Sequence, residues 1–313
     1  MKFVVTGGAG FIGSHLVEQL VADGHDVAVV DDFSTGKREN IEPWLGRIEL
    51  IEGSVVDPDV CARACVGADY VLHQAALASV PRSLANPVAT HHANVTGTLN
   101  VLMAARDAKV TRVVFAASSS AYGNTTELPK HEEMVPRPLS PYAASKLAGE
   151  AYLRAFHASF GIPTIALRYF NIFGPRQDPN SQYAAAVPRF ITAAMAGLPP
   201  VILGDGEQTR DFTYVANAVH ANLLACTAPL EACGTVYNVG CGSRITVNEL
   251  WRRIVSLTGS SSPIEYQPAR PGDVRDSLAC LARTQRALGY QPVVDFDEGL
   301  RRTVQSFATV AVA

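Results

Sequence analysis

A tyrosine, a lysine and a serine stand in a pattern that suits proton transfer at a hydroxyl group. Tyr142 and Lys146 are four residues apart, so on a helix they would share one face. A tyrosine phenol has a reference pKa of about 10, and an adjacent ammonium would stabilise its phenolate near neutral pH. Ser118 follows the predicted strand Arg112–Ala116 and would hydrogen-bond the reacting hydroxyl or carbonyl. A buried tyrosine with a surface lysine has the same spacing, so the interpretation depends on the other motifs.

A glycine-rich turn follows the first predicted strand. Gly7, Gly10 and Gly13 lie between the apolar run Lys2–Thr6 and a helix-length segment over Phe11–Asp23. Glycines there permit a tight turn and let backbone N–H groups approach a pyrophosphate at the helix N-terminus. The motif predicts a dinucleotide site at this turn.

An acidic residue ends the second predicted strand. Asp31 stands where a carboxylate can accept a hydrogen bond from a ribose 2′-hydroxyl and repel a 2′-phosphate. We therefore expect NAD rather than NADP as the cofactor. The positive charges of Lys37 and Arg38 could weaken the preference for NAD over NADP, but we interpret the two residues as a solvated loop pair.

Short β-branched runs alternate with helix-length segments in the first half of the chain. The predicted strands are Lys2–Thr6, Asp26–Asp31, Arg47–Glu52, Asp69–His73, Arg112–Ala116 and Thr164–Tyr169. The predicted helices are Phe11–Asp23, Asp57–Val66, Val88–Ala108 and one that begins near Pro141. This alternation predicts an α/β fold with a doubly wound parallel sheet of the Rossmann type over residues 1–170. The shorter, proline-rich elements of residues 171–313 predict a smaller C-terminal α/β lobe, partly interleaved with the main sheet.

Composition excludes several classes of protein. The 313 residues carry a net charge of −3, which offers no basic face for nucleic acid or anionic lipid. The longest apolar runs are strand-sized, and a strand begins at Lys2, so we expect neither a membrane-spanning helix nor a signal peptide. No C-x-x-C pair and no histidine spacing suggests a metal site, and we predict none. A reducing, cytoplasmic location suits the six cysteines, which are Cys61, Cys65, Cys226, Cys233, Cys241 and Cys280.

Over nearly its whole length the chain resembles the extended short-chain dehydrogenase/reductase family, and within it the nucleotide-sugar 4-epimerases that act on UDP-glucose or UDP-N-acetylglucosamine. The first matching segments are TGGAGFIGSH at 6–15, HQAALASVPRS at 73–83, SSSAYG at 118–123 and SPYAASK at 140–146. The later ones are LRYFNIFGPRQDPNSQYAAAVPRF at 167–190, GDGEQTRDFTYV at 204–215 and ARPGDVRDS at 269–277. These later segments discriminate, because many unrelated reductases share the glycine turn and Y-x-x-x-K.

The resemblance implies roles for individual residues. Tyr142 is expected to be the base, Lys146 its partner and Ser118 the anchor of the substrate hydroxyl. The residues expected to bind NAD are Gly7, Gly10, Phe11, Ile12, Gly13, Asp31, Asp32, Ser34, Thr35, Gly36, Gln74, Ala75, Ala76, Asn94, Tyr142 and Lys146. One position departs from the family, because Ser54 stands where an aspartate often contacts the adenine.

The C-terminal lobe is expected to hold the UDP-sugar. The matching positions are Ser79, Ser118, Ser119, Asn171, Ala185, Ala186, Arg210, Arg270, Asp273 and Ser277. Two arginines suit a diphosphate, because guanidinium groups make directional, charge-assisted hydrogen bonds. Arg210 and Arg270 could instead form plain surface pairs with the aspartates near them. The resemblance also implies a homodimer, through helices near 88–107 and 141–159.

The residues after Ser118 separate the chemistries of the family. The 4,6-dehydratases carry an Asp-Glu pair there and the UDP-glucuronate decarboxylases a glutamate, whereas this chain has Ser119 and Ser120. Neither serine can serve as the extra carboxylic acid, which favours a 4-epimerase. In that reaction a 4-keto sugar rotates within the site and receives the same hydride on its opposite face. A reductase with net NADH production and a non-catalytic NAD-sensing protein remain alternatives.

Ser277 suggests which sugar is bound. The family often has a bulky tyrosine at this position in enzymes restricted to UDP-glucose and UDP-galactose, whereas a small residue leaves room for a 2-N-acetyl group. We therefore expect interconversion of UDP-GlcNAc and UDP-GalNAc, with activity on UDP-glucose and UDP-galactose as well. An exposed loop serine without this role is one alternative interpretation. A UDP-glucose-only enzyme and a UDP-glucuronate 4-epimerase are others, and a glucuronate carboxylate would need an extra hydroxyl or basic partner near C6.

Overall fold

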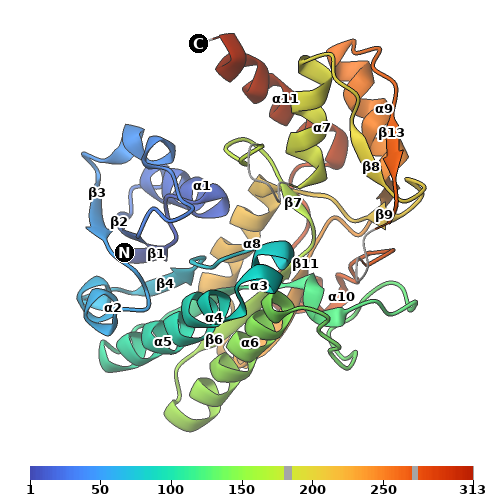
Figure 1. Ribbon diagram of the computed structural model, residues 1–313. Coiled ribbons are helices and arrows are strands. Elements are labelled where there is room, and N and C mark those ends of the chain that lie inside the picture. The colour runs from blue at the N-terminus through green and yellow to red at the C-terminus, as the bar shows by residue number, and fades with distance from the viewer. Residues whose placement is uncertain (180–184, 270–273, 313) are drawn as a thin grey trace.

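A seven-stranded parallel sheet forms the centre of the molecule, which is described by a computed structural model over residues 1–179, 185–269 and 274–312 (Figure 1). The strand order is β11-β6-β5-β4-β1-β2-β3, and every pair is parallel. The strands are β1 (Lys2–Thr6), β2 (Asp26–Asp31), β3 (Ile48–Glu52), β4 (Tyr70–His73), β5 (Arg112–Ser118), β6 (Thr164–Tyr169) and β11 (Thr235–Val239). The six predicted strands are present, and β5 runs two residues further than expected, so that Ser118 ends it. The seventh strand, β11, comes from the C-terminal half.

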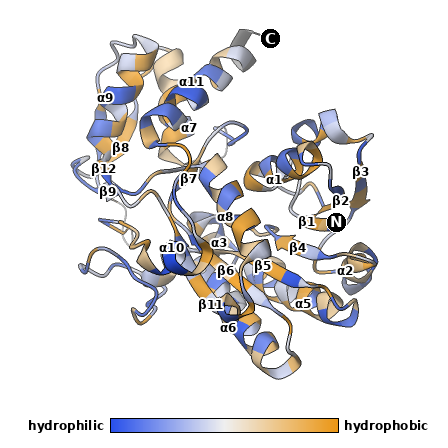
Figure 2. Cartoon of the chain, turned by 180° about the vertical axis from the view of Figure 1, so that it is seen from behind, coloured by the Kyte–Doolittle hydropathy of each residue, from blue (hydrophilic) through white to orange (hydrophobic). Residues whose placement is uncertain are grey.

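Helices cover both faces of this sheet, as the two opposite views show (Figures 1 and 2). One apolar core lies between the sheet and α1 with α8, and includes Leu16 and Ala218. The other lies between the sheet and α2, α5 and α6, and includes Val60, Val101 and Leu153. The helices of these layers are α1 (Phe11–Ala22), α2 (Pro58–Cys65), α3 (Val80–Ala85), α4 (Pro87–His91), α5 (Gly97–Asp107), α6 (Pro141–Phe160), α8 (Val215–Thr227) and α10 (Ala282–Leu288). Short 3-10 turns are η1 (Arg38–Asn40), η2 (Glu42–Trp44), η4 (Ser119–Tyr122) and η5 (Leu230–Ala232).

The helix expected over Val88–Ala108 is interrupted. Between α4 and α5 the backbone forms a π-helical turn, η3 (His92–Thr96). The turn carries Asn94, whose side chain bonds inward to the backbone N–H of Leu77 and to the Ser145 hydroxyl. Single π-helical turns of this kind are frequent at functional sites, and here the turn directs an amide toward helix α6.

The C-terminal lobe has an apolar core of its own, with Phe190, Trp251 and Ile254 among its buried residues. Its elements are β7 (Ile172–Phe173), α7 (Ala186–Met195), β8 (Val201–Leu203), β9 (Thr209–Arg210), β10 (Thr213–Tyr214), β12 (Ile245–Thr246), α9 (Val247–Thr258), β13 (Glu265–Gln267) and α11 (Phe296–Val312). Strand β7 pairs with β10, β9 with β12 and β8 with β13. After β10 the chain returns to the main sheet as α8 and β11, and then enters the lobe again.

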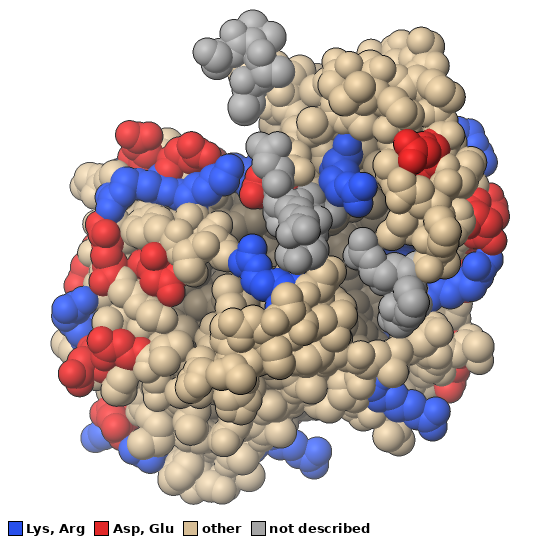
Figure 3. Space-filling model, in the orientation of Figure 1, with Lys and Arg blue, Asp and Glu red and all other residues tan. Residues whose placement is uncertain are grey.

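The carboxyl ends of the parallel strands meet at one edge of the sheet. Thr6, Asp31, His73, Ser118 and Tyr169 each end a strand at this edge. Ligands of doubly wound sheets bind at this edge. Figure 3 shows the surface hollowed between the sheet and the C-terminal lobe, with Lys and Arg side chains on both sides of the hollow. No helix in the described part of the chain is both long and apolar enough to cross a membrane.

Candidate active site

The first cavity, here called the cofactor cavity, has a volume of about 700 Å³ and lies over the ends of β1, β2 and β4. It is lined by every residue predicted to bind the cofactor except Asn94. It is also lined by Ser54, the position that departs from the family pattern. Sequence reasoning missed other lining residues, among them Phe33, Leu77, Ala78, Arg82, Gln177 and Asp178.

The glycine turn leaves no space for side chains. A Cβ on Gly13 would lie 2.1 Å from the Gly7 carbonyl oxygen, and a Cβ on Gly7 would lie 2.7 Å from the Ala75 backbone nitrogen. Gly7 also has φ of +67°, which side chains rarely adopt. Gly10 precedes α1, and no side chain caps the first N–H groups of that helix. The turn therefore offers backbone donors and bare space to a diphosphate, as NAD requires.

Asp31 is held at the rim of this cavity by backbone donors. Its carboxylate accepts hydrogen bonds of 2.9 Å from the N–H groups of Ala9 and Phe33. Burial raises the pKa of Asp31, and these two donors offset part of that rise. A Cβ on Gly36 would lie 2.6 Å from the carboxylate, so glycine is needed beside it.

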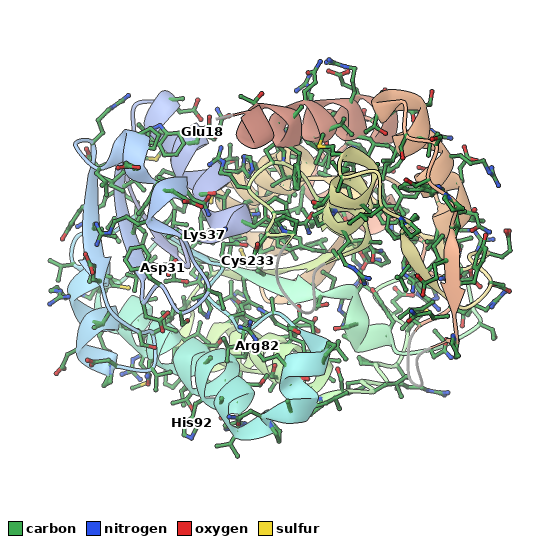
Figure 4. All side chains as sticks on the ribbon, turned by 45° about the horizontal axis from the view of Figure 1, so that its top comes forward. Glu18, Asp31, Lys37, Arg82, His92 and Cys233 are labelled. Carbon is green, nitrogen blue, oxygen red and sulfur yellow. The ribbon has the colours of Figure 1, made fainter. Side chains whose placement is uncertain are left out.

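The two cations after β2 are half-exposed and paired with acids. Lys37 lies near Glu39 and, at 3.8 Å, near Asp178, which lines the cofactor cavity. Arg38 pairs with Glu52. Figure 4 labels Asp31, Lys37 and Arg82, which come from the end of β2, the following loop and α3. The neutralised cations are consistent with the predicted solvated pair.

Helix α6 presents the tyrosine and the lysine together. Ser140 caps this helix by accepting a hydrogen bond from the Ala143 N–H, and Pro141 occupies its first turn. Burial raises the pKa of Tyr142, while a hydrogen bond with Ser118 offsets part of the rise. Burial lowers the pKa of Lys146 to about 7. Its ammonium lies 4.8 Å from the centre of the Phe115 ring and makes no hydrogen bond to the described residues.

A buried hydrogen-bond chain connects the glycine turn with α6. The Thr6 hydroxyl lies 2.6 Å from His73 Nδ1, and His73 Nε2 lies 2.9 Å from the Thr98 hydroxyl. Thr98 donates to the Asn94 carbonyl, so Nε2 must carry the proton and donate to Thr98. The Asn94 amide then donates to Ser145, which donates to the Tyr142 carbonyl.

Asn94 was expected to touch the cofactor, but its side chain lies one layer behind the cavity wall. Its neighbour Ala93 lines the cavity instead. Asn94 Oδ1 accepts a hydrogen bond of 2.8 Å from the Leu77 N–H. Through this bond and the one to Ser145, Asn94 connects the wall of the cofactor cavity to helix α6.

A second cavity of about 370 Å³, here called the sugar cavity, adjoins the first. The two cavities share five lining residues, namely Ile12, Ala78, Ala117, Tyr142 and Tyr169. The predicted substrate residues that line the sugar cavity are Ser118, Ser119, Asn171, Arg210 and Ser277. Ser120 and Lys130 line it as well, and none of its described lining residues is an aspartate or glutamate. Ser79, expected to contact the substrate, lines the cofactor cavity and caps α3.

Ser277 is buried, with 8% of its surface exposed, so it is not an exposed loop serine. Its hydroxyl accepts hydrogen bonds from Asn171 Nδ2 at 3.0 Å and from the Asp211 N–H at 3.4 Å. Asn171 has φ of +37°, a backbone conformation that asparagine tolerates better than most residues. The Asp211 carboxylate accepts from three backbone amides, those of Cys241, Gly242 and Ala279. These bonds hold Ser277 and Asn171 together at the cavity wall.

A third cavity, here called the lobe cavity, has a volume of about 270 Å³ and lies against α7 and β8. It is lined by the predicted residues Ala185 and Ala186, and it shares Asn171, Ile172 and Arg210 with the sugar cavity. The three cavities therefore form one row. Arg270 and Asp273, which were also expected at the substrate, lie outside the described residues.

Comparisons with known proteins agree with this arrangement. Residues 3–240 match the model of the family described as "NAD dependent epimerase/dehydratase family". The UDP-glucose 4-epimerase of Mycolicibacterium smegmatis is 38% identical over 311 residues, which is 98% of each chain. The structure of a UDP-glucose 4-epimerase of Thermotoga maritima with UDP-glucose is similar at a TM-score of 0.95 and 37% identity, covering 99% of this chain and 100% of that one.

A second solved structure carries a different sugar nucleotide. It is a UDP-N-acetylglucosamine 4-epimerase of Methanobrevibacter ruminantium in complex with UDP-N-acetylmuramic acid. The TM-score is 0.94 and the identity 41%, over 99% of this chain and 98% of that one. The protein described here belongs to the NAD-dependent epimerase/dehydratase family, and within it to the nucleotide-sugar 4-epimerases of the extended short-chain dehydrogenase/reductase type.

Proposed function

We propose that this enzyme interconverts UDP-GlcNAc and UDP-GalNAc at C4, and UDP-glucose and UDP-galactose as well. The observation that carries the proposal is the row of three cavities. Tyr142 lies where the cofactor cavity meets the sugar cavity, and Asn171 and Arg210 lie where the sugar cavity meets the lobe cavity. NAD, a hexose and a uridine would fill such a row in that order.

Each catalytic side chain has one task in this reaction. Tyr142 takes the proton of the C4 hydroxyl and later returns it, and Ser118 hydrogen-bonds the same oxygen. Lys146, whose pKa burial brings to about 7, supplies the positive charge that stabilises the Tyr142 phenolate. NAD held at the glycine turn would accept a hydride from C4 and give it back.

The walls of the sugar cavity favour epimerisation over elimination or decarboxylation. Ser119 and Ser120 occupy the positions where those reactions need a carboxylic acid, and no described acidic residue lines the cavity. Epimerisation then requires only that the 4-keto sugar rotates so that its opposite face meets the cofactor. Arg210 at the junction with the lobe cavity would hold the diphosphate during that rotation, so the ketone is not released.

The preference for an N-acetylated sugar is supported by Ser277. Its side chain is small, buried and part of the cavity wall, so a 2-N-acetyl group would meet a hydroxyl rather than an aromatic ring. The M. ruminantium relative, whose ligand is N-acetylated, supports the same sugar assignment. The T. maritima relative supports activity on the glucose pair.

We further propose that two copies associate through α5 and α6. In Figure 1 these helices lie side by side with α3 and α4 on one face, and the surface over them carries few charged side chains in Figure 3. Met103 on α5 and Phe160 on α6 are exposed apolar residues of these two helices. A cytoplasmic location is supported by the cysteines, which are unpaired.

The decisive experiment is to incubate the purified protein with UDP-GlcNAc, UDP-glucose and UDP-glucuronate separately, without added reductant. Products are resolved by anion exchange and proton NMR, and absorbance reports any NADH. We expect UDP-GalNAc to form until equilibrium, with no net NADH. Conversion of UDP-glucose alone would contradict the sugar assignment, and net NADH would indicate a reductase instead.

Ser277→Tyr tests the assignment of the sugar. The larger side chain should lower kcat/KM for UDP-GlcNAc at least about 10-fold by filling the space of the acetyl group, and leave UDP-glucose nearly unchanged. Ser261→Tyr, at an exposed serine of the lobe, is the matched control. An equal loss on both sugars would show that Ser277 does not select by size.

A further inference from the structure

Lys130 is a buried cation in the wall of the sugar cavity, and the epimerisation described above makes no use of it. It lies in the segment between η4 and α6, and only 1% of its surface is exposed. It lines the sugar cavity together with Ser118, Ser120 and Ser277. It does not line the lobe cavity, where the uridine is expected.

The backbone of Lys130 is fixed by three hydrogen bonds. Its N–H donates to the Leu278 carbonyl at 2.7 Å, and its own carbonyl accepts from the Cys280 N–H at 2.8 Å. The Asn238 side-chain amide donates to the same carbonyl at 2.9 Å. These bonds do not involve the side chain, so they would form with an apolar residue at this position as well.

The side chain of Lys130 has unused hydrogen-bonding capacity. Its ammonium donates to the Thr125 carbonyl, which uses one of three N–H donors. Within the described residues it forms no ion pair. Asp276 and Glu127 raise its pKa from a distance, but burial lowers it more. A buried ammonium without a paired anion is unfavourable, and methionine or leucine would fill the same volume at less cost.

An anion supplied by the substrate would resolve this imbalance. The neutral groups of glucose or galactose need only hydroxyl and amide partners, which Ser118, Ser120 and Asn171 can supply. A carboxylate on the hexose would instead form a charge-assisted hydrogen bond with a lysine in its cavity. The structure thus places Lys130, a basic residue, in the wall of the sugar cavity, and a uronic acid requires a basic partner there.

Resting on the proposed function, we propose that Lys130 is a specificity residue that binds a carboxylate on the hexose, so that UDP-hexoses bearing a carboxylate are substrates. The chemistry at C4 is unchanged, because Tyr142 acts on the same hydroxyl. Lys130 widens the range of sugars rather than replacing the N-acetylated and neutral ones.

The test compares UDP-glucuronate with UDP-glucose, which differ only at C6. Initial rates are measured for the wild type, Lys130→Met, Lys130→Arg and the control Lys109→Met, an exposed lysine after α5. We expect Lys130→Met to lower kcat/KM for UDP-glucuronate at least about 10-fold, mainly through KM, and to change UDP-glucose less than about 2-fold. Lys130→Arg should retain most of the activity on UDP-glucuronate, and the control should match the wild type.

Binding of UDP, UDP-glucose and UDP-glucuronate to the same variants is measured by calorimetry. Lys130→Met should weaken only UDP-glucuronate. Equal losses on all three ligands would overturn the proposal, because Lys130 would then serve the diphosphate or the fold. Wild-type protein that epimerises UDP-glucose but neither binds nor converts UDP-glucuronate would also overturn it. If the proposed function is wrong, no UDP-hexose will be epimerised. The comparison of ligand binding would still decide the role of Lys130 in that case.

Discussion

Burial acts in opposite directions on the two titratable residues of α6. It raises the pKa of Tyr142 and lowers the pKa of Lys146 to about 7, because an apolar setting disfavours phenolate and ammonium alike. Burial therefore opposes loss of the Tyr142 proton, and positive charge placed beside the phenol favours it. The Ser118 hydroxyl contributes in the same sense by hydrogen-bonding Tyr142.

Tyr142→Phe removes the group that carries this proton. We expect kcat to fall more than about 100-fold, because general-base catalysis is lost, while NAD remains bound. Turnover of UDP-glucose measures the first effect, and calorimetric titration with NAD measures the second. Tyr152→Phe, on the same helix but away from the three cavities, is the control. Near-normal turnover by Tyr142→Phe would exclude the proposed role.

His73 couples pH to stability. It is buried between two threonine hydroxyls, and burial lowers its pKa from 6.5 to about 3, with the charge of Lys146 adding to the effect. The unfolded chain therefore binds a proton below pH 6.5 that the folded chain does not. Above pH 6.5 His73 is neutral in both states and the full free energy of unfolding is present. As the pH falls from 6.5 toward 3, protonation of the unfolded chain lowers that free energy.

We expect the wild type to lose about 1.4 kcal/mol of unfolding free energy per pH unit below 6.5 through this group. His73→Gln cannot take up the proton and should show a shallower slope. Urea denaturation between pH 7 and 4.5 measures both. His15, whose pKa is also lowered, is present in both proteins and cancels in the comparison. Parallel slopes would show that His73 does not titrate as described.

At the scale of elements, the β1–α1 turn leaves no space for an added side chain. Gly13→Ala would bring a methyl group within 2.1 Å of the Gly7 carbonyl oxygen, between the turn and the helix that it opens. We expect the affinity for NAD to fall at least about 10-fold, because the backbone donors would move. Gly46→Ala is the matched control, because a Cβ there meets nothing within 4 Å. Calorimetric titration with NAD compares the two, and equal affinity would refute this account of the turn.

The elements themselves differ in how far their sequences predict them. Buried strands such as Asp26–Asp31 read as continuous apolar runs, and the caps at Ser140 and Asp57 mark helix starts. The π-helical turn His92–Thr96 carries no comparable signal. It is stabilised by bonds from Asn94 to Leu77 and Ser145, which are distant in sequence.

For the whole molecule, association is the property to test. We expect light scattering after size-exclusion chromatography to give about twice 33.4 kDa for the wild type. Met103→Glu, on the exposed face of α5, should shift the protein toward the monomer because a charge would be buried between copies. Leu257→Glu, on α9 of the C-terminal lobe, is the control. A monomeric wild type would contradict the dimer proposal.

What the sequence by itself determined is local. The order of strands and helices, the glycine turn and the spacing of Tyr142 and Lys146 follow from periodicity and from neighbouring residues, and together they predict the fold and the NAD site. The 4-epimerase chemistry is implied by the resemblance to the family. Only the tertiary structure decided which residues share a cavity. Ser277 is bonded to Asn171 from 106 positions away, and Asn94 lies behind the cavity wall rather than in it. Lys130 lines the sugar cavity because its backbone pairs with residues 278–280, a long-range contact that no local pattern encodes.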